Sequence, residues 1–365
     1  MPKLILDVMG GDYAPQANLD GALQALPSLE DELVLVADKE AIKPFLSKLR
    51  YRALDQALKQ GYYKNCKISL LHAAETIDMA DSIRAIRSKP GASINVGCRL
   101  AAKDWKEKTP SAFISAGHSG AMMASALLNM GRLPGIERPA IAVKLPTLST
   151  DGCIILDVGA NVDCKPEHLR DFAMMGAEFA KVERQNPALP KVALLSNGEE
   201  LSKGNELTRA ALALIKDNPC FNGKNAIGNF IGYSEGKDFF KGSVDVVVAD
   251  GFVGNVVLKS IEGLGSAVTS ILKKEAKRNP ISTLGFILSA SVFTQLKRKL
   301  DYAEYGAAPL LGVSGYAFIC HGRSNGKAIK NALLRSEAAL KSKYIENLET
   351  ALKKHFESKT EEPQS

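Results

Sequence analysis

The chain has 365 residues, of which 45% are hydrophobic, 24% charged and 6% aromatic. This length and composition suit a large folded α/β protein and exclude a globally disordered or fibrous chain. The six cysteines lie far apart and form no CxxC pair, which argues against a disulfide framework and against a zinc knuckle. The formal net charge is +7, and most of that excess comes from residues 273–299.

The N-terminus passes from a short apolar run into an acidic glycine turn, unlike a signal peptide with its long apolar stretch. No segment reaches the roughly 18 uninterrupted apolar residues that a bilayer-spanning helix needs. We therefore expect a cytoplasmic protein that does not cross a membrane.

Buried strands are predicted where continuous Val, Ile and Leu runs end in a polar or glycine-rich turn. These runs are Leu4–Asp12, Glu32–Asp38, Ser111–Gly120, Cys153–Asn161, Lys191–Glu200 and Val244–Asn255. Helical periods follow at Ala121–Met130, Pro166–Val182 and Asn205–Lys216. The alternation predicts a three-layer α/β/α fold with a mostly parallel, doubly wound sheet.

Ligands of open parallel sheets gather where strands end at their carboxyl side, so the polar glycine turns are the places to look for chemistry. Gly263 and Gly265 lack the third glycine of a dinucleotide motif and lie inside a helix-like run. Gly322–Lys327 is one residue short of a P-loop and is followed by Ala328. Metal-ligand spacings are also missing, so we predict neither a metal nor another cofactor.

The turn Ser115–Ala121 follows a predicted strand and precedes a predicted helix. Its letters nearly spell the GxSxG nucleophile elbow, and Asp250 and His321 downstream would complete a serine acylhydrolase triad with Ser119. Alternatively, Ser119 and backbone N–H groups at the helix N-terminus bind an anion such as phosphate. Both interpretations stay open on this turn alone.

The segment Asp157–Leu169 places polar side chains between a predicted strand and a predicted helix. Asp163 and Pro166 suit the start of that helix. Asn161 and Lys165 add an amide donor and a cation, which can orient a phosphate or polarise a carbonyl group.

Residues 273–299 hold seven Lys and Arg residues against one Glu. Between the two basic groups lies the apolar run Ile281–Gln295, which is too short to span a bilayer. A core helix or a dimer seam is one interpretation. The other is a hairpin, about 273–300, whose apolar tip and basic shoulders lie in the headgroup region of an anionic membrane. The candidate contacts are Lys273, Lys274, Phe286, Ile287, Phe293, Lys297 and Arg298.

The organisation that we predict is one α/β domain over residues 1–335, followed by an exposed charged helix and a frayed tail over residues 336–365.

Taken together, the segments resemble the PlsX family, the phosphate acyltransferases that move a fatty acyl chain from acyl carrier protein to inorganic phosphate. The resemblance extends from the first predicted strand to about Arg335. The matching stretches are Met9–Pro15, Ala80–Ile94, Ser115–Ala121, Gly135–Ile141, Leu156–Leu169, Asn197–Glu206, Val246–Lys259, Tyr305–Gly315 and His321–Ser324.

The resemblance implies a metal-free transfer of a long-chain acyl group to phosphate, which yields an acyl phosphate for phospholipid synthesis. It implies a fold similar to the isocitrate/isopropylmalate dehydrogenase-like and phosphotransacetylase folds. It also implies a peripheral membrane homodimer that uses acyl carrier protein and binds no nucleic acid. Acyl carrier protein could share the positive surface of residues 273–300. A serine acylhydrolase and a noncatalytic phosphate- or carrier-binding regulator remain the alternatives.

The candidate site residues follow from the polar turns and from this resemblance. For catalysis they are Asn161, Lys165 and His321. For binding of phosphate and the acyl group they are Asp7, Gly10, Gly11, Asp12, Lys89, Gly117, His118, Ser119, Gly120, Asn197, Gly254 and Asn255.

Two stretches depart from the family pattern. The family usually has SAGNTGA where this chain has His118 and Ser119, so a hydroxyl is kept and an amide is replaced by an imidazole. The family's GNVEGRD becomes Gly232–Asp238 with Lys237 in place of Arg, which loses bidentate hydrogen-bonding geometry.

Overall fold

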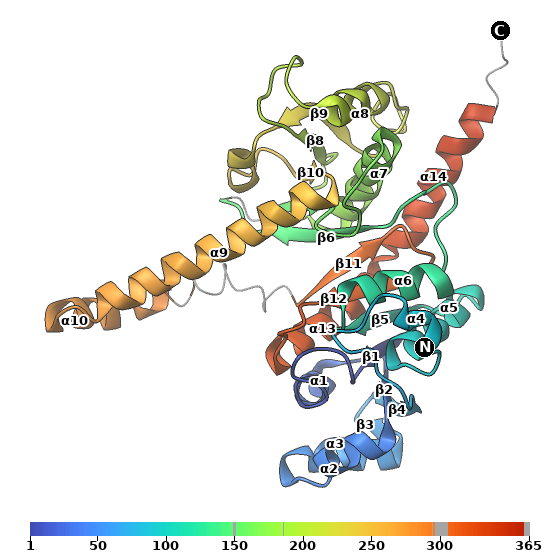
Figure 1. Ribbon diagram of the computed structural model, residues 1–365, viewed down its shortest axis with the longest axis vertical. Coiled ribbons are helices and arrows are strands. Elements are labelled where there is room, and N and C mark those ends of the chain that lie inside the picture. Colours follow the sequence, from blue (N-terminus) through green and yellow to red (C-terminus); the bar gives the residue numbers. More distant parts are fainter. Residues whose placement is uncertain (149–150, 185, 294, 296–305, 361–365) are drawn as a thin grey trace.

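A mostly parallel sheet of 12 strands runs through the computed structural model, which describes residues 1–148, 151–184, 186–293, 295 and 306–360 (Figure 1). The strands lie in the order β3-β4-β2-β1-β5-β12-β11-β6-β7-β10-β8-β9. Their bounds are β1 (Lys3–Asp7), β2 (Glu32–Ala37), β3 (Tyr62–Tyr63), β4 (Cys66–His72), β5 (Ser111–Ser115), β6 (Ala140–Leu145), β7 (Cys153–Leu156), β8 (Lys191–Leu195), β9 (Asn229–Ser234), β10 (Val246–Val248), β11 (Ala307–Leu311) and β12 (Tyr316–Cys320).

Two parallel blocks make up this sheet. The first contains β4, β2, β1, β5 and β12, and the second contains β7, β10, β8 and β9. Between them, β11 is antiparallel to both β12 and β6, and β6 is antiparallel to β7. Because the strand direction reverses three times from β12 to β7, the carboxyl ends of the two blocks lie at opposite edges of the sheet.

Helices cover both faces of the sheet, which confirms the predicted three-layer α/β/α fold. Strands β2, β5 and β7 are buried at every residue, as continuous apolar strands between two helical layers must be. One face packs against α1 (Gln16–Ala25), α2 (Lys39–Leu46), α3 (Arg52–Gln60), α7 (Pro166–Glu183), α8 (Glu206–Lys216), α13 (Gly326–Ser342) and α14 (Tyr344–Thr360). The other packs against α4 (Ala85–Ser88), α5 (Ser93–Lys106), α6 (Ser119–Asn129) and part of α9 (Gly251–Ala276).

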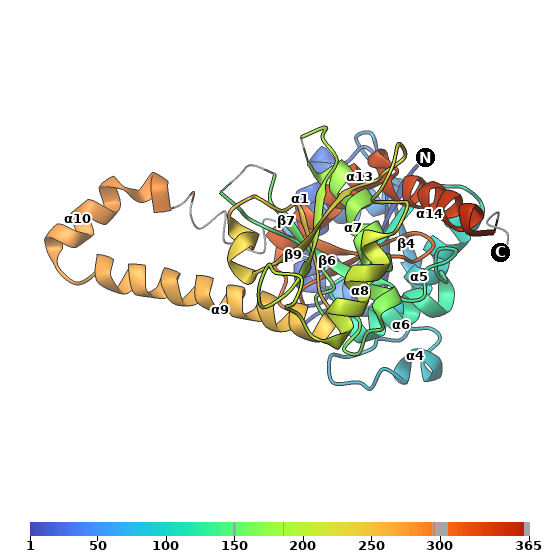
Figure 2. The same ribbon diagram turned by 90° about the horizontal axis from the view of Figure 1, so that it is seen from above.

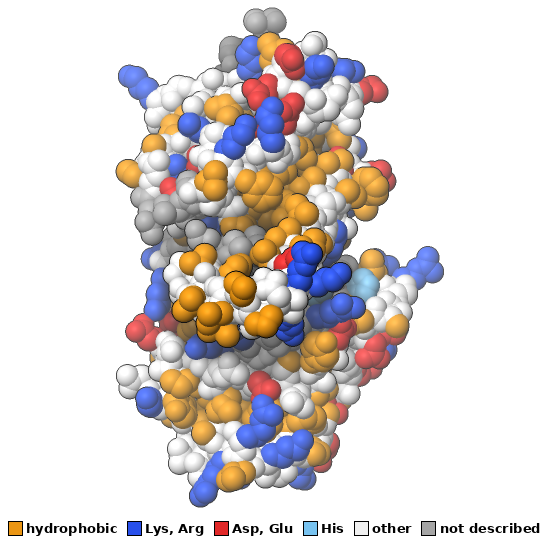
Figure 3. Space-filling view, turned by 90° about the vertical axis from the view of Figure 1, so that its left-hand side faces the viewer, with side chains coloured by type: hydrophobic (Ala, Val, Ile, Leu, Met, Phe, Trp, Pro, Cys, Tyr) orange, Lys and Arg blue, Asp and Glu red, His pale blue; other side chains and the backbone are white. Residues whose placement is uncertain are grey.

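Helix α9 extends well beyond the sheet, and α10 (Pro280–Leu288) folds back at its far end (Figures 1 and 2). We call residues 263–293 the arm. Apolar side chains gather at its tip with Lys and Arg side chains beside them (Figure 3); Ile281 is 84% exposed and Leu288 78% exposed. The Thr283 hydroxyl of α10 donates to the carbonyl oxygen of Ala276 at the end of α9 at 2.9 Å, and within the returning segment the Phe286 and Phe293 rings stack with their centroids 4.2 Å apart. Lys297 and Arg298 lie outside the described residues.

The predicted boundary at residue 335 needs correction, because α13 runs through it without a break. The segment after it is also not an exposed helix over its whole length. Tyr344, Ile345, Leu348 and Leu352 of α14 are buried in the core, and the Tyr344 ring packs edge-on against Phe179. Four apolar side chains on one face of α14 therefore attach it to the domain.

In the part of the chain that the structure describes, no helix is long and apolar enough to cross a membrane.

Candidate functional site

Three turns meet at the carboxyl ends of the neighbouring strands β1, β5 and β12. The Asp12 backbone N–H donates to the Gly322 carbonyl oxygen at 2.8 Å. A Cβ atom placed on Gly10 would lie 2.7 Å from the backbone nitrogen of Gly117, so only glycine permits this approach. We call Gly10–Asp12, Gly117–Gly120 and His321–Arg323 together the glycine-turn site.

The glycine-turn site is supported from beneath by Asp7 and Ser115. Asp7 is 1% exposed, and burial raises the pKa of its carboxyl group. The Ser115 hydroxyl donates to Asp7 Oδ2 at 2.7 Å and accepts from the Gly117 N–H at 3.0 Å. Asp7, predicted as a substrate ligand, thus lies below the turn and holds it in place.

The neighbouring imidazoles are oriented by the backbone. His118 Nδ1 accepts from the Ala121 N–H at 3.2 Å, and His321 Nδ1 accepts from the Arg323 N–H at 3.1 Å. A neutral imidazole bound this way carries its hydrogen on Nε2 and is a donor there. Burial, followed by the charge of Lys259, lowers the pKa of His321. His118 therefore caps α6, and it adds an Nε2–H donor.

The same geometry argues against the Ser119, Asp250 and His321 triad. In a triad the aspartate accepts a hydrogen from the histidine Nδ1. Here Nδ1 of His321 is itself an acceptor, and Asp250 Oδ1 accepts from the Phe252 and Val253 N–H groups at the start of α9. The serine acylhydrolase arrangement is not formed.

Residues 76–91 lie against two of the three turns. Met79 Cε is 2.9 Å from a Cβ atom placed on Gly322, and Ile83 Cδ1 is 3.0 Å from one placed on Gly120. Lys89 Nζ donates to Asp81 Oδ2 at 2.7 Å and to the Thr76 carbonyl at 3.0 Å. Its hydrogen bond to Asp81 raises the pKa of Lys89. Lys89, predicted to bind substrate, is thus engaged in holding this segment.

A second cluster surrounds the end of β7. Asp157 is buried and accepts from the N–H groups of Ile141 at 3.0 Å and Asn161 at 2.7 Å. The Asn161 side-chain amide donates to Asp157 Oδ2 at 2.9 Å and to the Pro139 carbonyl at 2.7 Å. Both amide hydrogens are therefore occupied, so the structure places Asn161 as a positioning residue and not as a free donor to substrate.

Lys165 and His168 lie at the start of α7, beyond this cluster. His168 Nδ1 accepts from the Lys165 N–H at 3.1 Å, and its Nε2 is 3.1 Å from Glu137 Oε2. Both ring nitrogens of the buried His168 therefore have polar partners, as a structural histidine requires. The Lys165 side chain is exposed and belongs to the opposite sheet edge from His321. The three predicted catalytic residues therefore fall into two separate clusters.

Helix α9 connects the two clusters. A Cβ atom on Gly254 would overlap the carbonyl oxygen of Asp157, and one on Gly159 would lie 3.8 Å from the Asn255 side chain. Gly254 and Asn255 thus fix the first turn of α9 on the Asp157 turn. Further along, Lys259 lies close enough to lower the pKa of His321. The helix begins at one cluster and passes the other.

Asn197 lies apart from both clusters, at the end of β8. Its Oδ1 accepts from the Gly204 N–H at 3.0 Å. Nearby, carboxylate oxygens of Glu199, Glu235 and Asp238 come within 4.8 Å of one another. Lys237 pairs with Glu235 and Lys241 with Asp238, so ion pairs account for this acidic group.

Sequence reasoning missed Ser115, Met79, Ile83 and Lys259. Ser115 stands in a turn that was singled out, and a hydroxyl two residues before Gly117 was the available signal. Ile83 and Lys259 lie in the family-like stretches Ala80–Ile94 and Val246–Lys259, but only the fold brings them beside Gly120 and His321; Met79 has no such signal.

The sequence matches the fatty acid synthesis protein family over residues 2–347. Curated relatives named phosphate acyltransferase include one from Citrifermentans bemidjiense, 46% identical over 93% of this chain and 90% of its own length. Another, from Dictyoglomus turgidum, is 44% identical over 93% of this chain and 94% of its own length.

Among solved structures, the EutD phosphotransacetylase from Staphylococcus aureus matches with a TM-score of 0.56 at 14% identity, covering 93% of this chain and 94% of its own. A phosphotransacetylase from Streptococcus pyogenes matches with a TM-score of 0.52 at 15% identity, covering 93% and 94% of the two chains. These two likenesses concern the fold. The matches to the family and to its curated members show that this chain is an acyltransferase and belongs to the PlsX family of fatty acid synthesis proteins.

Proposed function

We propose that the protein transfers a long-chain fatty acyl group from acyl carrier protein to inorganic phosphate, supplying acyl phosphate for phospholipid synthesis. The glycine-turn site carries this proposal. The N-terminus of α6 with Ser119, and the backbone-oriented imidazoles of His118 and His321, belong to the turns that meet at this edge of one parallel block. Helix N-termini and backbone N–H groups in such turns bind phosphate well.

In this site phosphate is the nucleophile. An oxygen of HPO4²⁻ attacks the thioester carbonyl carbon, the new C–O bond forms, and the C–S bond breaks. The proton of HPO4²⁻ leaves with the sulfur, which gives the acyl phosphate and the free carrier thiol. The protein has to position the two reactants and stabilise negative charge on the carbonyl oxygen. We assign that second task to His321, whose Nδ1 accepts the Arg323 N–H and whose pKa is lowered by burial and by the charge of Lys259.

The test uses acyl carrier protein charged with palmitate, incubated with the enzyme with and without phosphate. Release of palmitoyl phosphate that depends on phosphate supports the proposal. Free palmitate formed in both reactions would indicate a hydrolase, and unchanged thioester would indicate a regulator. Ser119→Ala keeps measurable turnover if Ser119 only binds phosphate. A covalent acyl-Ser119 adduct trapped during turnover would contradict the proposal.

We also propose that the arm associates with an anionic membrane. Its tip exposes apolar side chains, and Lys273 and Lys274 lie on the last turns of α9, an arrangement that suits a headgroup region. A variant with Phe286, Ile287 and Phe293 changed to Ser should stop floating with anionic liposomes and keep its turnover of dissolved substrate. A control with the exposed Leu214 and Ile231 changed to Ser should still float. Full flotation of the arm variant would reject this role.

A homodimer is the third part of the proposal. Val256, Leu264 and Ile271 leave an apolar stripe on α9 that is more than half exposed at each residue, which suits a second copy of the chain. Leu264→Glu together with Ile271→Glu should give a monomer by light scattering, and Ile231→Glu should not. A wild-type protein that is already monomeric would contradict a dimer.

A further inference from the structure

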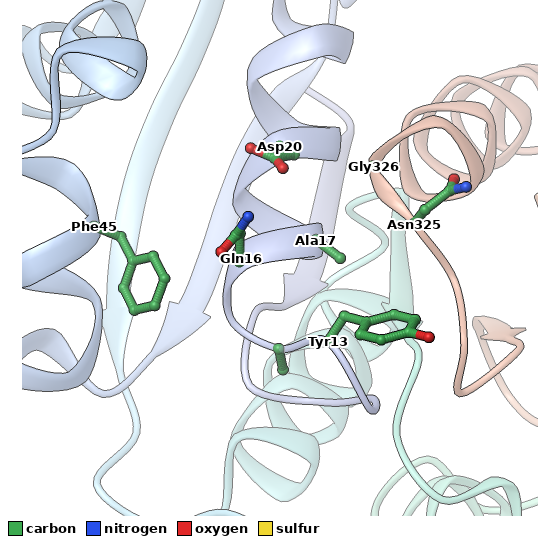
Figure 4. Close-up of a pocket in the computed structure, with 8 residues that line it drawn as sticks. Tyr13, Gln16, Ala17, Asp20, Phe45, Asn325 and Gly326 are labelled. Carbon is green, nitrogen blue, oxygen red and sulfur yellow. The ribbon is translucent and has the colours of Figure 1, made fainter.

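A pocket of about 440 Å³ lies directly beside the glycine-turn site. Tyr13 in its wall follows Asp12, and Asn325 follows the His321 turn. Figure 4 shows Tyr13 and Asn325 on one side of the pocket, Phe45 on the opposite side, and Gln16 on α1 between them. Two walls of the pocket are thus continuations of two catalytic turns.

The lining suits an extended chain of alternating amide and alkyl groups. Tyr13 is 56% exposed and offers a ring edge with a hydroxyl group; Phe45 offers an apolar ring, and Gln16 and Asn325 offer side-chain amides. Asp20 at the rim is already bonded to the Tyr51 hydroxyl at 2.6 Å. With polar side chains placed between two aromatic rings, this lining offers hydrogen-bonding groups as well as apolar surface, as a chain of alternating amide and alkyl groups requires.

The surface around the pocket is basic. Residues 12–20, 38–52 and 321–330, which form and flank the pocket, hold eight Lys and Arg against four Asp and Glu. The Lys43 and Arg323 side chains are 75% and 76% exposed, and each also pairs with a carboxylate, Lys43 with Glu40 at 3.6 Å and Arg323 with Asp12 at 4.0 Å. The Lys48 ammonium stands 4.7 Å from the Phe45 ring centroid. A positive rim of this kind attracts and orients an acidic partner.

We infer that the acyl carrier protein docks on this rim and passes its phosphopantetheine arm through the pocket to the His321 turn. The inference rests on the proposed function, because only a carrier-bound donor needs both a surface that binds an acidic protein and a channel for the phosphopantetheine chain. It separates the two basic surfaces of the molecule: the rim of the pocket binds the carrier, and the arm of residues 263–293 binds lipid.

The first test measures binding of fluorescently labelled carrier protein by anisotropy, without phosphate, so that no turnover is needed. Lys43→Glu, Lys48→Glu and Lys327→Glu in one chain should weaken binding at least tenfold. The control carries the same charge change at three exposed lysines of the second block, Lys203→Glu, Lys216→Glu and Lys224→Glu, and should bind as the wild type does. Equal binding of both variants would overturn the inference.

The second test separates the rim from the pocket. Gln16→Trp fills the pocket and leaves the rim charges in place. It should lower the affinity for holo carrier protein to that for the apo form, which lacks the phosphopantetheine arm, and should leave apo binding unchanged. Unchanged holo binding would overturn the pocket assignment.

A third variant, with Lys273, Lys274 and Lys277 changed to Glu, should keep carrier binding. Loss of carrier binding in this variant would show that the carrier docks on the arm of residues 263–293 and not on the rim of the pocket. Formation of palmitoyl phosphate is scored separately in every variant, so a failure of the docking inference and a failure of the proposed reaction give different results.

Discussion

The tetrapeptide Ile-Leu-Asp-Val occurs twice in this chain, at residues 5–8 and 155–158, and each copy ends a buried strand. In both copies the aspartate is buried, and burial raises the pKa of its carboxyl group. The two carboxylates nevertheless have different neighbours. Asp157 accepts from the backbone N–H groups of Ile141, Gly159, Ala160 and Asn161. Asp7 accepts from the Met9 N–H and the Ser115 hydroxyl.

This difference separates a closed turn from an open one. Asp157 makes its hydrogen bonds within its own loop and to β6, so its turn is a rigid support for the first turn of α9. Asp7 holds its turn through Ser115. At the start of α6, His118 takes the Ala121 N–H, which leaves the Ser119 and Gly120 N–H groups as the donors that a bound anion would use. Identical local sequences thus give a structural support in one block and a candidate anion site in the other.

The largest difference that we expect between the two aspartates is in their contribution to the free energy of unfolding. Asp157→Ala leaves several buried N–H groups without an acceptor and should lower the free energy of unfolding by about 3–5 kcal/mol. Asp7→Ala leaves fewer backbone N–H groups without an acceptor, because serine hydroxyls are among its donors and can rotate to other partners. It should cost only about 1–3 kcal/mol, with a greater loss of activity. Urea unfolding of both variants measures the difference, and equal losses would mean that the two carboxylates do the same work.

The second effect concerns the close contact between Gly254, in the first turn of α9, and the Asp157 carbonyl. Gly254→Ala pushes a methyl group into the Asp157 carbonyl and should destabilise the protein by about 1–3 kcal/mol. Gly263→Ala is the matched control, since no atom lies within 4 Å of the new methyl in the same helix. It should be neutral or stabilise by up to about 1 kcal/mol. Thermal unfolding distinguishes the two, and the reverse order would place the α9 contact elsewhere.

A smaller effect is expected at the open turn. Ser115→Ala removes the hydroxyl between Asp7 and the Gly117 N–H, which should raise the KM for phosphate about tenfold, equivalent to about 1.4 kcal/mol. Its kcat should change much less. Ser111→Ala on the same strand removes a buried hydroxyl that has no hydrogen-bond partner, and its KM should match the wild type. A change in kcat alone would argue against a phosphate-binding turn.

The smallest effect is a pH dependence. Since burial raises the folded-state pKa of Asp7 above the model-peptide value of about 3.8, its protonated form favours folding. That contribution is complete below the unfolded-state pKa and is lost as the pH rises through the folded-state pKa. The stability of Asp7→Asn relative to the wild type should therefore increase as the pH rises from about 4 and then level off. If the stability difference between Asp7→Asn and the wild type does not change with pH in this range, burial does not raise the pKa of the Asp7 carboxyl group.

Much of the local structure could be predicted from the sequence. Predicted runs such as Glu32–Asp38 and Ser111–Gly120 contain β2 and β5, and the period Asn205–Lys216 closely matches α8. Continuous apolar runs, capping residues and glycine turns act over a few neighbouring residues, so they can be found in a single chain. The predicted runs did not include β3, β4, β6, β9, β11 and β12.

What the sequence determined by itself was the parts: the α/β class, the polar turns and the family motifs. The tertiary structure decided how those parts meet. The antiparallel strands β11 and β6 put the carboxyl ends of the two blocks at opposite edges, which separates Asn161 and Lys165 from His321. Packing likewise buried α14 despite its many charges. Strand pairing and helix docking depend on contacts between residues far apart in the chain, and no local pattern encodes them.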